Sequence, residues 1–248
     1  MKKSLVYIFI VVILVSCQTR QQYTITSLNG ERIPVLTAKN TDKEIVAFVD
    51  WYKQQLDSEM KQVIGQSDQH MPFGRPESLL TNLTSDIMQQ LDESIAGAKV
   101  DLAIMNVHGH RAQMPKGNVT VGDIFEIYSF DNALVVLQLK GKDLMAVFDA
   151  YAKMGGAGIS STVKLKIKNE QLIEAKINGQ SVDDERLYTI VTLDYLAEGN
   201  DGFEALKNAL SFNSSGILLR EYMLNYFKQQ TTEGKIVSSK LDGRIIIE

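Results

Sequence analysis

Residues 188–203 read YTIVTLDYLAEGNDGF, a strand-like pattern that runs directly into a polar, glycine-rich loop. Its first half, 188–193, is rich in β-branched and aliphatic side chains and predicts a buried β-strand. In the loop, two glycines flank Asn200 and Asp201, a composition typical of tight turns. A rigid strand can hold such a loop against solvent, so the stretch predicts a binding site at a strand end.

Strand-like and helical patterns recur along the rest of the chain. Further strands are predicted over 100–106, 133–140, 163–168 and 244–248. Apolar residues at three- and four-residue steps predict helices from 41 to a stop at Gly65, and over 77–96, 143–153 and 218–228. This mixture indicates one α/β or α+β domain from residue 41 to 248.

Three polar clusters are placed at the ends of predicted strands. The first, 106–111, reads NVHGHR, and the second, 129–132, reads SFDN. The third is the loop at 194–203. Together they offer two aromatic faces, Phe130 and Tyr195, beside an arginine, asparagines and an aspartate, a set of groups suited to binding a small polar molecule.

Each cluster also has a simpler interpretation. Phe130 and Tyr195 could be core aromatics, and residues 199–202 alone could be a turn. Arg111 could be a surface or ion-pairing arginine. His108 and His110 alternate, so on a strand they would share a face and could bind a metal ion, although no carboxylate–histidine pattern accompanies them.

Composition and charge narrow the classes of function. The chain has 248 residues, of which 44% are hydrophobic and 23% charged, as is typical of a folded globular protein. Its net charge of −4 argues against nucleic acid as a partner, because neutralising phosphates needs a face rich in lysine and arginine. The one cysteine, Cys17, excludes an internal disulfide framework and cysteine-built metal sites.

The N-terminus has the pattern of an export signal. Residues 1–17 read MKKSLVYIFIVVILVSC, two lysines followed by an apolar run. The run is shorter than the roughly 20 residues that a spanning helix needs, and it fits a signal-peptide core. Its end, Leu14 to Cys17, resembles the lipobox of bacterial lipoproteins, which implies cleavage before Cys17 and acylation of that residue. The alternative is an ordinary signal peptide or a short membrane anchor.

We therefore expect a signal peptide over 1–17, a polar tether over 18–40 and a folded domain over 41–248. Several lipid chains on Cys17 would hold the protein stably on a membrane. The expected location is the cell envelope, with the protein lipid-anchored on the periplasmic or outer surface.

The order of motifs between 103 and 203 resembles the C-terminal, substrate-binding domain of bacterial 5′-nucleotidases. The family's Asn-x-Gly-x-(Ile/Leu)-Arg loop is matched by 106–111, and its Pro-Phe-x-Asn by 129–132. Its closing Phe-Leu-Ala-x-Gly-Gly-Asp-Gly-(Phe/Tyr) is matched by 195–203. Upstream, Glu77, Asn82-Leu83 and Asp86 are similar to a family helix. The resemblance covers about residues 75–210 and implies an α+β fold with four layers, α/β/β/α.

The resemblance also implies a set of substrate-binding residues. In that family two aromatics sandwich the nucleoside base, and these correspond to Phe130 and Tyr195. The aspartate that binds the ribose hydroxyls corresponds to Asp201. The other implied contacts are Asn106, Arg111, Asn132, Gly158 and Arg75. These residue types suit a nucleotide, because aromatic rings stack on any base, carboxylates accept hydrogen bonds from hydroxyls and arginine pairs with phosphate.

Four residues depart from the family pattern. His108 replaces a glycine, and it would be strained if that position has a positive φ. His110 replaces an aliphatic residue, and Ser129 replaces the proline before Phe130. Asn200 replaces the second glycine of Gly-Gly-Asp, which is a mild change because asparagine tolerates the left-handed conformation.

The largest difference from the family is a missing part. The family's hydrolysis is performed by an N-terminal metallophosphatase domain, whose two metals are held by aspartates and histidines. This chain has three histidines and none of those motifs, and residues 18–75 are too few for such a domain. We therefore expect no catalytic residue, no metal ligand and no cofactor in this chain, with divalent metals held by a separate metallophosphatase partner.

The expected function is the nucleotide- or nucleoside-binding half of a split 5′-nucleotidase. A stand-alone nucleoside-binding lipoprotein is the alternative within binding proteins. A structural or interaction lipoprotein with a decayed pocket is the alternative from another class. An autonomous hydrolase that uses His108 and His110 is the enzymatic alternative.

Overall fold

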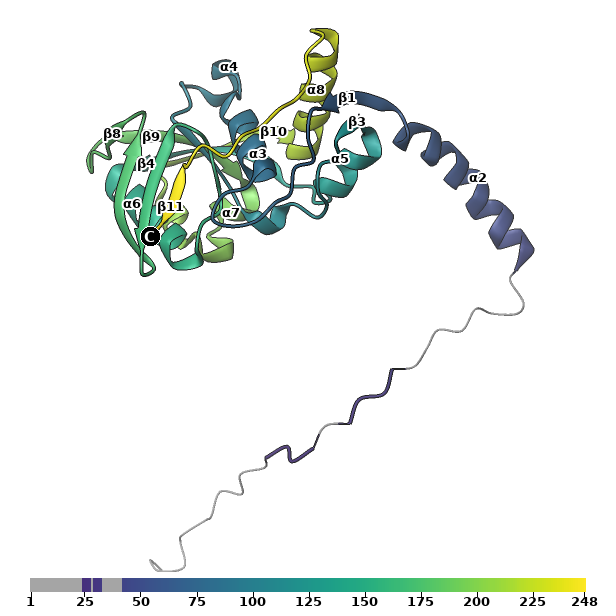
Figure 1. Cartoon of the computed structure of the whole chain (residues 1–248), viewed down its shortest axis with the longest axis horizontal. Helices are drawn as coiled ribbons and strands as arrows, with labels where there is room; N and C mark the ends of the chain where they lie inside the picture. The colour runs from purple at the N-terminus through teal and green to yellow at the C-terminus, as the bar shows by residue number, and fades with distance from the viewer. Residues whose placement is uncertain (1–23, 28, 33–41) are drawn as a thin grey trace, which may run out of the picture. The chain divides into compact units, whose positions relative to one another are not determined.

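The computed structural model describes residues 24–27, 29–32 and 42–248 (Figure 1). The expected signal peptide with Cys17, and most of the expected tether, lie outside the described residues. The chain divides into two units, Met1–Val46 and Ala47–Glu248. Helix α2 (Lys43–Met60) spans this division, and every later element belongs to the second unit.

A five-stranded mixed sheet forms the centre of the second unit. Its strands run in the order β10 (Ser211–Leu218), β4 (Ala133–Lys140), β9 (Leu187–Leu193), β2 (Leu102–Met105) and β5 (Gly158–Ile159). All four residues of β2 are buried, and so are six of the seven residues of β9. Strands covered on both faces have nearly continuous apolar sequences, which is why β4 and β9 could be recognised from the sequence.

A four-stranded sheet lies closer to solvent. Its order is β11 (Ile245–Ile247), β6 (Val163–Lys168), β7 (Gln171–Ile177) and β8 (Gln180–Ser181). In β6, buried Val163, Leu165 and Ile167 alternate with lysines that are exposed or partly exposed. This sheet therefore packs one face on the core and turns the other to water.

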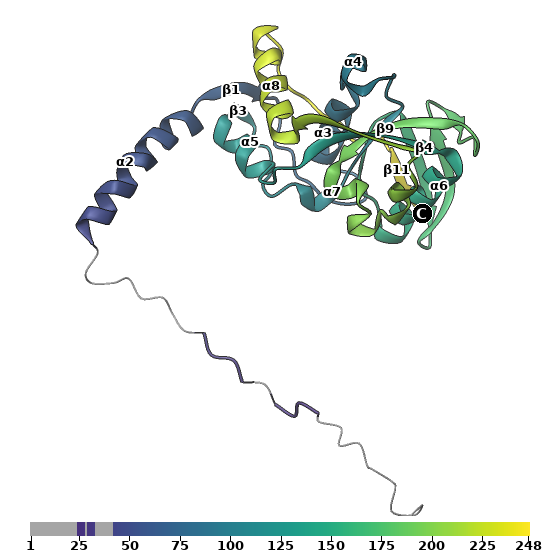
Figure 2. The same cartoon turned by 180° about the vertical axis from the view of Figure 1, so that it is seen from behind.

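Helices cover the two sheets. Helix α3 (Leu79–Gln89) packs against β2, β5 and β9, and α6 (Gly141–Met154) packs against β7, β6 and β4. Helix α8 (Leu219–Thr232) contacts β1 (Val63–Ser67) and α5 (Val121–Ile127), and it lies beside them in both views (Figures 1 and 2). Strand β1 pairs with β3 (Gly117–Thr120) in a separate ribbon. The shorter elements are α4 (Glu93–Ala96), α7 (Asp194–Ala197) and the 3₁₀ turns η1 (Val107–Gly109), η2 (Asn200–Gly202) and η3 (Glu204–Asn208).

Two predicted helices were too long. The first ends at Met60, because Val63–Ser67 pairs with β3 instead of continuing the helix. Gly65 serves this packing, since a Cβ there would lie 2.8 Å from the Phe227 ring of α8. The helix predicted over 77–96 is broken after Gln89, and the side chain of Asp92 begins α4 by accepting a hydrogen bond from the Ser94 amide.

The other predicted elements agree closely with the structure. Strands predicted over 133–140 and 163–168 are β4 and β6, and the last predicted strand is β11. Strands β7 and β10, the β1–β3 ribbon and helix α5 were not predicted. The expected α+β class, with two sheets and helices packed on them, is confirmed.

A buried ionic cluster fastens the C-terminal segment to α3. Arg244 is only 1% exposed, and it donates two hydrogen bonds of 3.0 Å to the carboxylate of Asp86. It donates two more to Asp242, of 3.0 and 2.9 Å, and one of 2.7 Å to the carbonyl of Ile159. Glu77 accepts from the Gly243 amide. These contacts hold the segment that leads into β11.

Candidate functional site

The directions of three strands bring the polar clusters together. Strands β2 and β9 are parallel neighbours, with Leu102 opposite Ile190, so both end at the same edge of the sheet. Strand β4 is antiparallel to β9, with Leu134 opposite Leu193, so it begins at that edge. The loops at 106–111, 129–132 and 194–203 must therefore meet there, although they are far apart in the sequence.

These loops enclose a hollow of about 260 Å³, which we call the aromatic pocket. The residues that line it are Asn106, His108, Gly109, Arg111, Phe130, Asn132, Tyr195 and Asp201. Six of the eight are residues that the sequence nominated for substrate binding. The structure thus brings them together in one place, while their roles toward a ligand stay predictions.

Phe130 and Tyr195 are not core aromatics. Their exposed fractions are 48% and 40%, whereas Phe203 at the end of the same loop is fully buried against Tyr151. The Arg111 guanidinium lies 5.8 Å from the centroid of the Phe130 ring, within cation–π range. Two aromatic faces are therefore accessible in the pocket, with a cation beside one of them.

Asp201 is held from two sides. Its carboxylate accepts a hydrogen bond of 3.0 Å from the Tyr195 hydroxyl and one of 2.6 Å from the side-chain amide of Asn106. The hydrogen bond to Asp201 and the charge of its carboxylate raise the pKa of the Tyr195 hydroxyl. Asp201 has the left-handed φ of 55°, which aspartate tolerates better than most residues. The turn thus fixes a carboxylate at the edge of the pocket.

Asn106 presents an unused acceptor. Its side chain is 7% exposed, and while its amide nitrogen donates to Asp201, its Oδ1 has no hydrogen-bond partner. A Cβ at position 109 would lie 2.4 Å from this oxygen, so only glycine leaves room for it. Buried acceptors are normally satisfied, so this oxygen, closed off from solvent beside Gly109, is an exception among the described side chains.

The two histidines of the first loop occupy opposite environments. Residues 107–109 form the turn η1, not a strand, so the shared face considered from their alternation is wrong. His108 is exposed and does not have a positive φ, so it is not strained. His110 is 1% exposed and lies 2.8 Å from the Thr84 hydroxyl, and burial lowers the pKa of its ring to about 4.

The structure also explains why asparagine can stand at position 200, where the family pattern has glycine. Asn200 does not adopt the left-handed conformation, which falls instead on Gly199, Asp201 and Gly202. The Asn200 side chain donates a hydrogen bond of 2.8 Å to the carbonyl of Tyr195. It therefore braces the loop that carries Tyr195.

Two nominated residues lie outside the aromatic pocket. Arg75 lines a second hollow of about 200 Å³, which shares Asn106, His108 and Asp201 with the first. Gly158 is buried in β5, where its carbonyl accepts a hydrogen bond from Tyr151, and it lines neither hollow. Its expected place near a base stays a prediction.

Arg220 is a supporting residue that sequence reasoning missed. It makes an ion pair with Asp131 and donates a hydrogen bond of 3.0 Å to the carbonyl of Tyr128. These contacts fix both sides of Phe130. No sequence signal could have identified Arg220, because it lies in α8, 89 positions after Asp131 in the chain.

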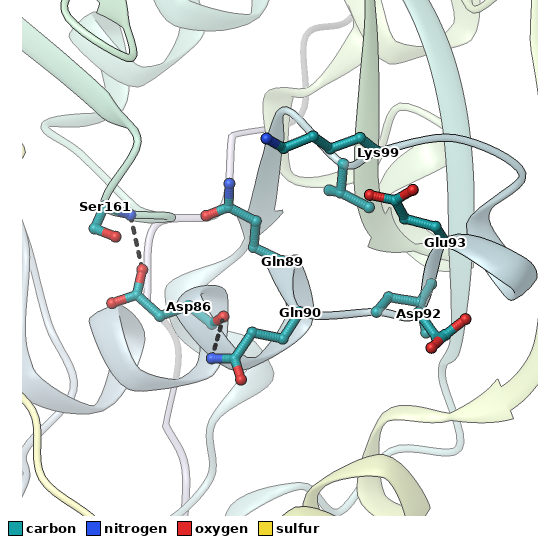
Figure 3. A pocket seen from close by; sticks show the side chains of 9 residues that line it. Asp86, Gln89, Gln90, Asp92, Glu93, Lys99 and Ser161 are labelled. Carbon is teal, nitrogen blue, oxygen red and sulfur yellow. Dashed lines mark hydrogen bonds between the residues drawn. The ribbon is translucent and has the colours of Figure 1, made fainter.

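A larger hollow of about 770 Å³ lies at the C-terminal end of α3 (Figure 3). It is lined mainly by polar side chains, and it includes the carboxylate of Asp86. That carboxylate accepts from the Ser161 amide and from Arg244, so its hydrogen-bonding capacity serves the fold. Its lining contains no aromatic residue, unlike that of the aromatic pocket.

The amino-acid sequence is similar to a known family and to several known proteins. The family described as the 5′-nucleotidase C-terminal domain matches residues 63–208. The trifunctional nucleotide phosphoesterase protein YfkN of Bacillus subtilis is 27% identical over 233 residues, which cover 86% of this chain and 16% of that protein. Protein UshA of Escherichia coli is 21% identical over 225 residues, which cover 88% of this chain and 40% of UshA. The chain thus spans less than half the length of these relatives.

Solved structures of 5′-nucleotidases contain a domain with the same fold. The 5′-nucleotidase precursor from Thermus thermophilus superposes with a TM-score of 0.70 at 29% identity, over 82% of this chain and 42% of that one. The matched family covers more than half of the chain, and the fold agrees. The chain therefore belongs to the family of the 5′-nucleotidase C-terminal domain, the substrate-binding type of domain in those enzymes.

Proposed function

We propose that this chain is the nucleotide- or nucleoside-binding half of a split 5′-nucleotidase. The observation that carries the proposal is the aromatic pocket, where Phe130 and Tyr195, 65 positions apart, expose their rings beside the carboxylate of Asp201. Stacking between two rings would hold any base. A carboxylate at the edge of the stack would accept hydrogen bonds from ribose hydroxyls.

Hydrolysis would be supplied by a second chain. Two-metal phosphoester hydrolysis needs several aspartate and histidine ligands, and the sequence contains three histidines. Of these, His110 is buried in the core and bonded to Thr84. A separately encoded metallophosphatase would hold the divalent metals, and this chain would present the nucleotide to it.

The proposed place of action is the cell envelope, through a lipid on Cys17. Support comes from the sequence that ends at Leu14–Cys17. Among the described residues, no helix is both long and apolar enough to cross a membrane.

Calorimetric titration with adenosine tests the binding proposal. Tyr195→Ala should remove one stacking face and weaken binding roughly 5- to 150-fold. Phe130→Ala should have a similar effect. Its matched control Phe212→Ala should not, because Phe212 is also an exposed phenylalanine, at 59% against 48%, but lies on β10 outside the pocket. Absence of binding of both adenosine and AMP to the wild type at millimolar concentration would refute the proposal.

Activity measurements test the division into two chains. The purified chain should release no phosphate from AMP in the presence of Mn²⁺ or Zn²⁺. Activity should appear when a metallophosphatase chain encoded nearby is added, and it should fall in Asp201→Asn. Robust metal-dependent hydrolysis by the chain alone, lost in His108→Ala, would instead support the autonomous hydrolase.

A further inference from the structure

His108 connects the two hollows of the site. It lines both the aromatic pocket and the second hollow, whose remaining lining residues are Arg75, Val107, Met154, Ala157 and Phe203. The neighbours Val107 and Gly109 in η1 are buried, whereas His108 is exposed. The turn therefore exposes one imidazole that lines both hollows.

The lining of the two hollows favours a negatively charged group. Arg111 lines the first and Arg75 lines the second, whereas Asp201 is the acidic residue in both linings. The carboxylate of Asp201 already accepts hydrogen bonds from Tyr195 and Asn106. A local excess of cationic side chains in a chain of net charge −4 attracts anions.

Arg75 is positioned for such a group by the end of α6. Its Nε donates a hydrogen bond of 2.8 Å to the carbonyl of Met154, which fixes the arginine at the wall of the second hollow. Its two terminal nitrogens can still donate to a ligand, in the fork geometry that suits a phosphate. The second hollow therefore combines a fixed guanidinium with the imidazole of His108.

The order of these residues matches the order of groups in a nucleotide. A base between Phe130 and Tyr195 would place its ribose at Asp201 and Asn106, which lie at the border shared by the two hollows. A phosphate on that ribose would then reach His108 and Arg75. An imidazole can donate one N–H when neutral and two when protonated, so it can bind a phosphate oxygen in either form.

We propose that His108 is a specificity-determining residue that binds the phosphate, so that the chain prefers nucleotides to nucleosides. The inference depends on the proposed function, since it needs a base in the aromatic pocket. It assigns this role to a residue that stands where the family resemblance has glycine, so this chain would have gained a phosphate contact.

The test compares AMP with adenosine by calorimetry in the wild type and in His108→Gly. We expect the wild type to bind AMP more tightly. His108→Gly should weaken AMP binding about 5-fold or more, as expected for a charge-assisted hydrogen bond, and change adenosine binding less than about 2-fold. His108→Lys should keep the preference for AMP. His70→Gly is the matched control, because His70 is also exposed but lines neither hollow.

The possible failures are distinguishable. Adenosine binding without any preference for AMP, or an equal loss of both ligands in His108→Gly, would overturn the role of His108 and leave the proposed function standing. If neither AMP nor adenosine binds the wild type, the proposed function itself fails, and the inference fails with it. Thermal unfolding of each variant checks that the fold is retained.

Discussion

Replacing Arg244 with methionine should destabilise the whole second unit. Methionine can fill much of the buried volume of arginine, but it removes the charge and all five hydrogen bonds to Asp86, Asp242 and Ile159. The cluster joins α3 to the segment before β11, so its loss affects two elements at once. Breaking a buried ion pair by removing one partner typically costs about 3–5 kcal/mol, because a charge is left uncompensated.

The structure places the expected loss at the lower end of that range. Asp86 would keep its hydrogen bond from the Ser161 amide, and Asp242 would keep its ion pair with Lys164 at 3.1 Å. Burial by itself would raise the pKa of Asp242, but the hydrogen bonds and charges of Arg244 and Lys164 outweigh it and lower that pKa. We therefore expect a loss of about 3 kcal/mol, which corresponds to a fall in Tm of about 6–12 °C for a domain of this size.

Urea unfolding followed by circular dichroism would measure the free energy of unfolding. Arg186→Met is the matched control, because Arg186 pairs with Asp101 at 2.6 Å but its side chain is 49% exposed. The control should change stability by no more than about 1 kcal/mol. Arg244→Lys should fall between the wild type and Arg244→Met, since lysine keeps the charge but not the paired hydrogen bonds. Equal losses in Arg244→Met and Arg186→Met would refute the reasoning.

Three further changes have definite expected outcomes. The pKa of His110 is about 4 in the fold and 6.5 ordinarily; its contribution to stability is therefore complete above pH 6.5 and lost as the pH falls toward 4. Between pH 7 and pH 5 the wild type should lose about 2 kcal/mol more than His110→Leu in urea unfolding, and parallel losses would contradict this. Gly109→Ala should lower both stability and adenosine affinity, because the new Cβ would meet Asn106 Oδ1 at 2.4 Å; unchanged values for both would show that the loop adapts. Cys17→Ser should release the protein from the detergent phase or leave its signal uncleaved, and normal partitioning would end the lipoprotein hypothesis.

The strands that could be predicted are those whose sequence shows burial, either as a mostly apolar or β-branched segment, as in β4 and β9, or as the apolar–lysine alternation of β6. Strand β4 reads ALVVLQLK and β9 reads LYTIVTL; both are mostly buried, and helices pack against each of them. Strand β10 reads SFNSSGIL and is mostly exposed, so its sequence contains no apolar run. It exists because its backbone pairs with β4, which is a tertiary interaction that local sequence does not report.

The candidate site was predictable to the extent that its residues lie in ordered motifs. The resemblance of its motifs to the family nominated six residues of one pocket, and the parallel pairing of β2 with β9, which the sequence did not predict, explains why their loops meet. The contacts between these residues were not predictable. Asn106 and Asp201 are 95 positions apart, and whether their side chains bond depends on angstrom-scale placement of two turns.

The hydrogen bonds already present around Asp201 make the site better suited to a sugar, not less. An ionised carboxylate offers about four acceptor sites, and Tyr195 and Asn106 occupy two of them. Two sites remain on Asp201 for the hydroxyls of a ligand. A ribose brings two neighbouring hydroxyl donors. Because the acceptors are held by the turn and by each other before any ligand arrives, binding would cost little further ordering of the protein. The hydrogen bond that the Tyr195 hydroxyl donates to Asp201 also fixes the Tyr195 ring. The stacking face and the carboxylate that would contact the sugar are therefore positioned together.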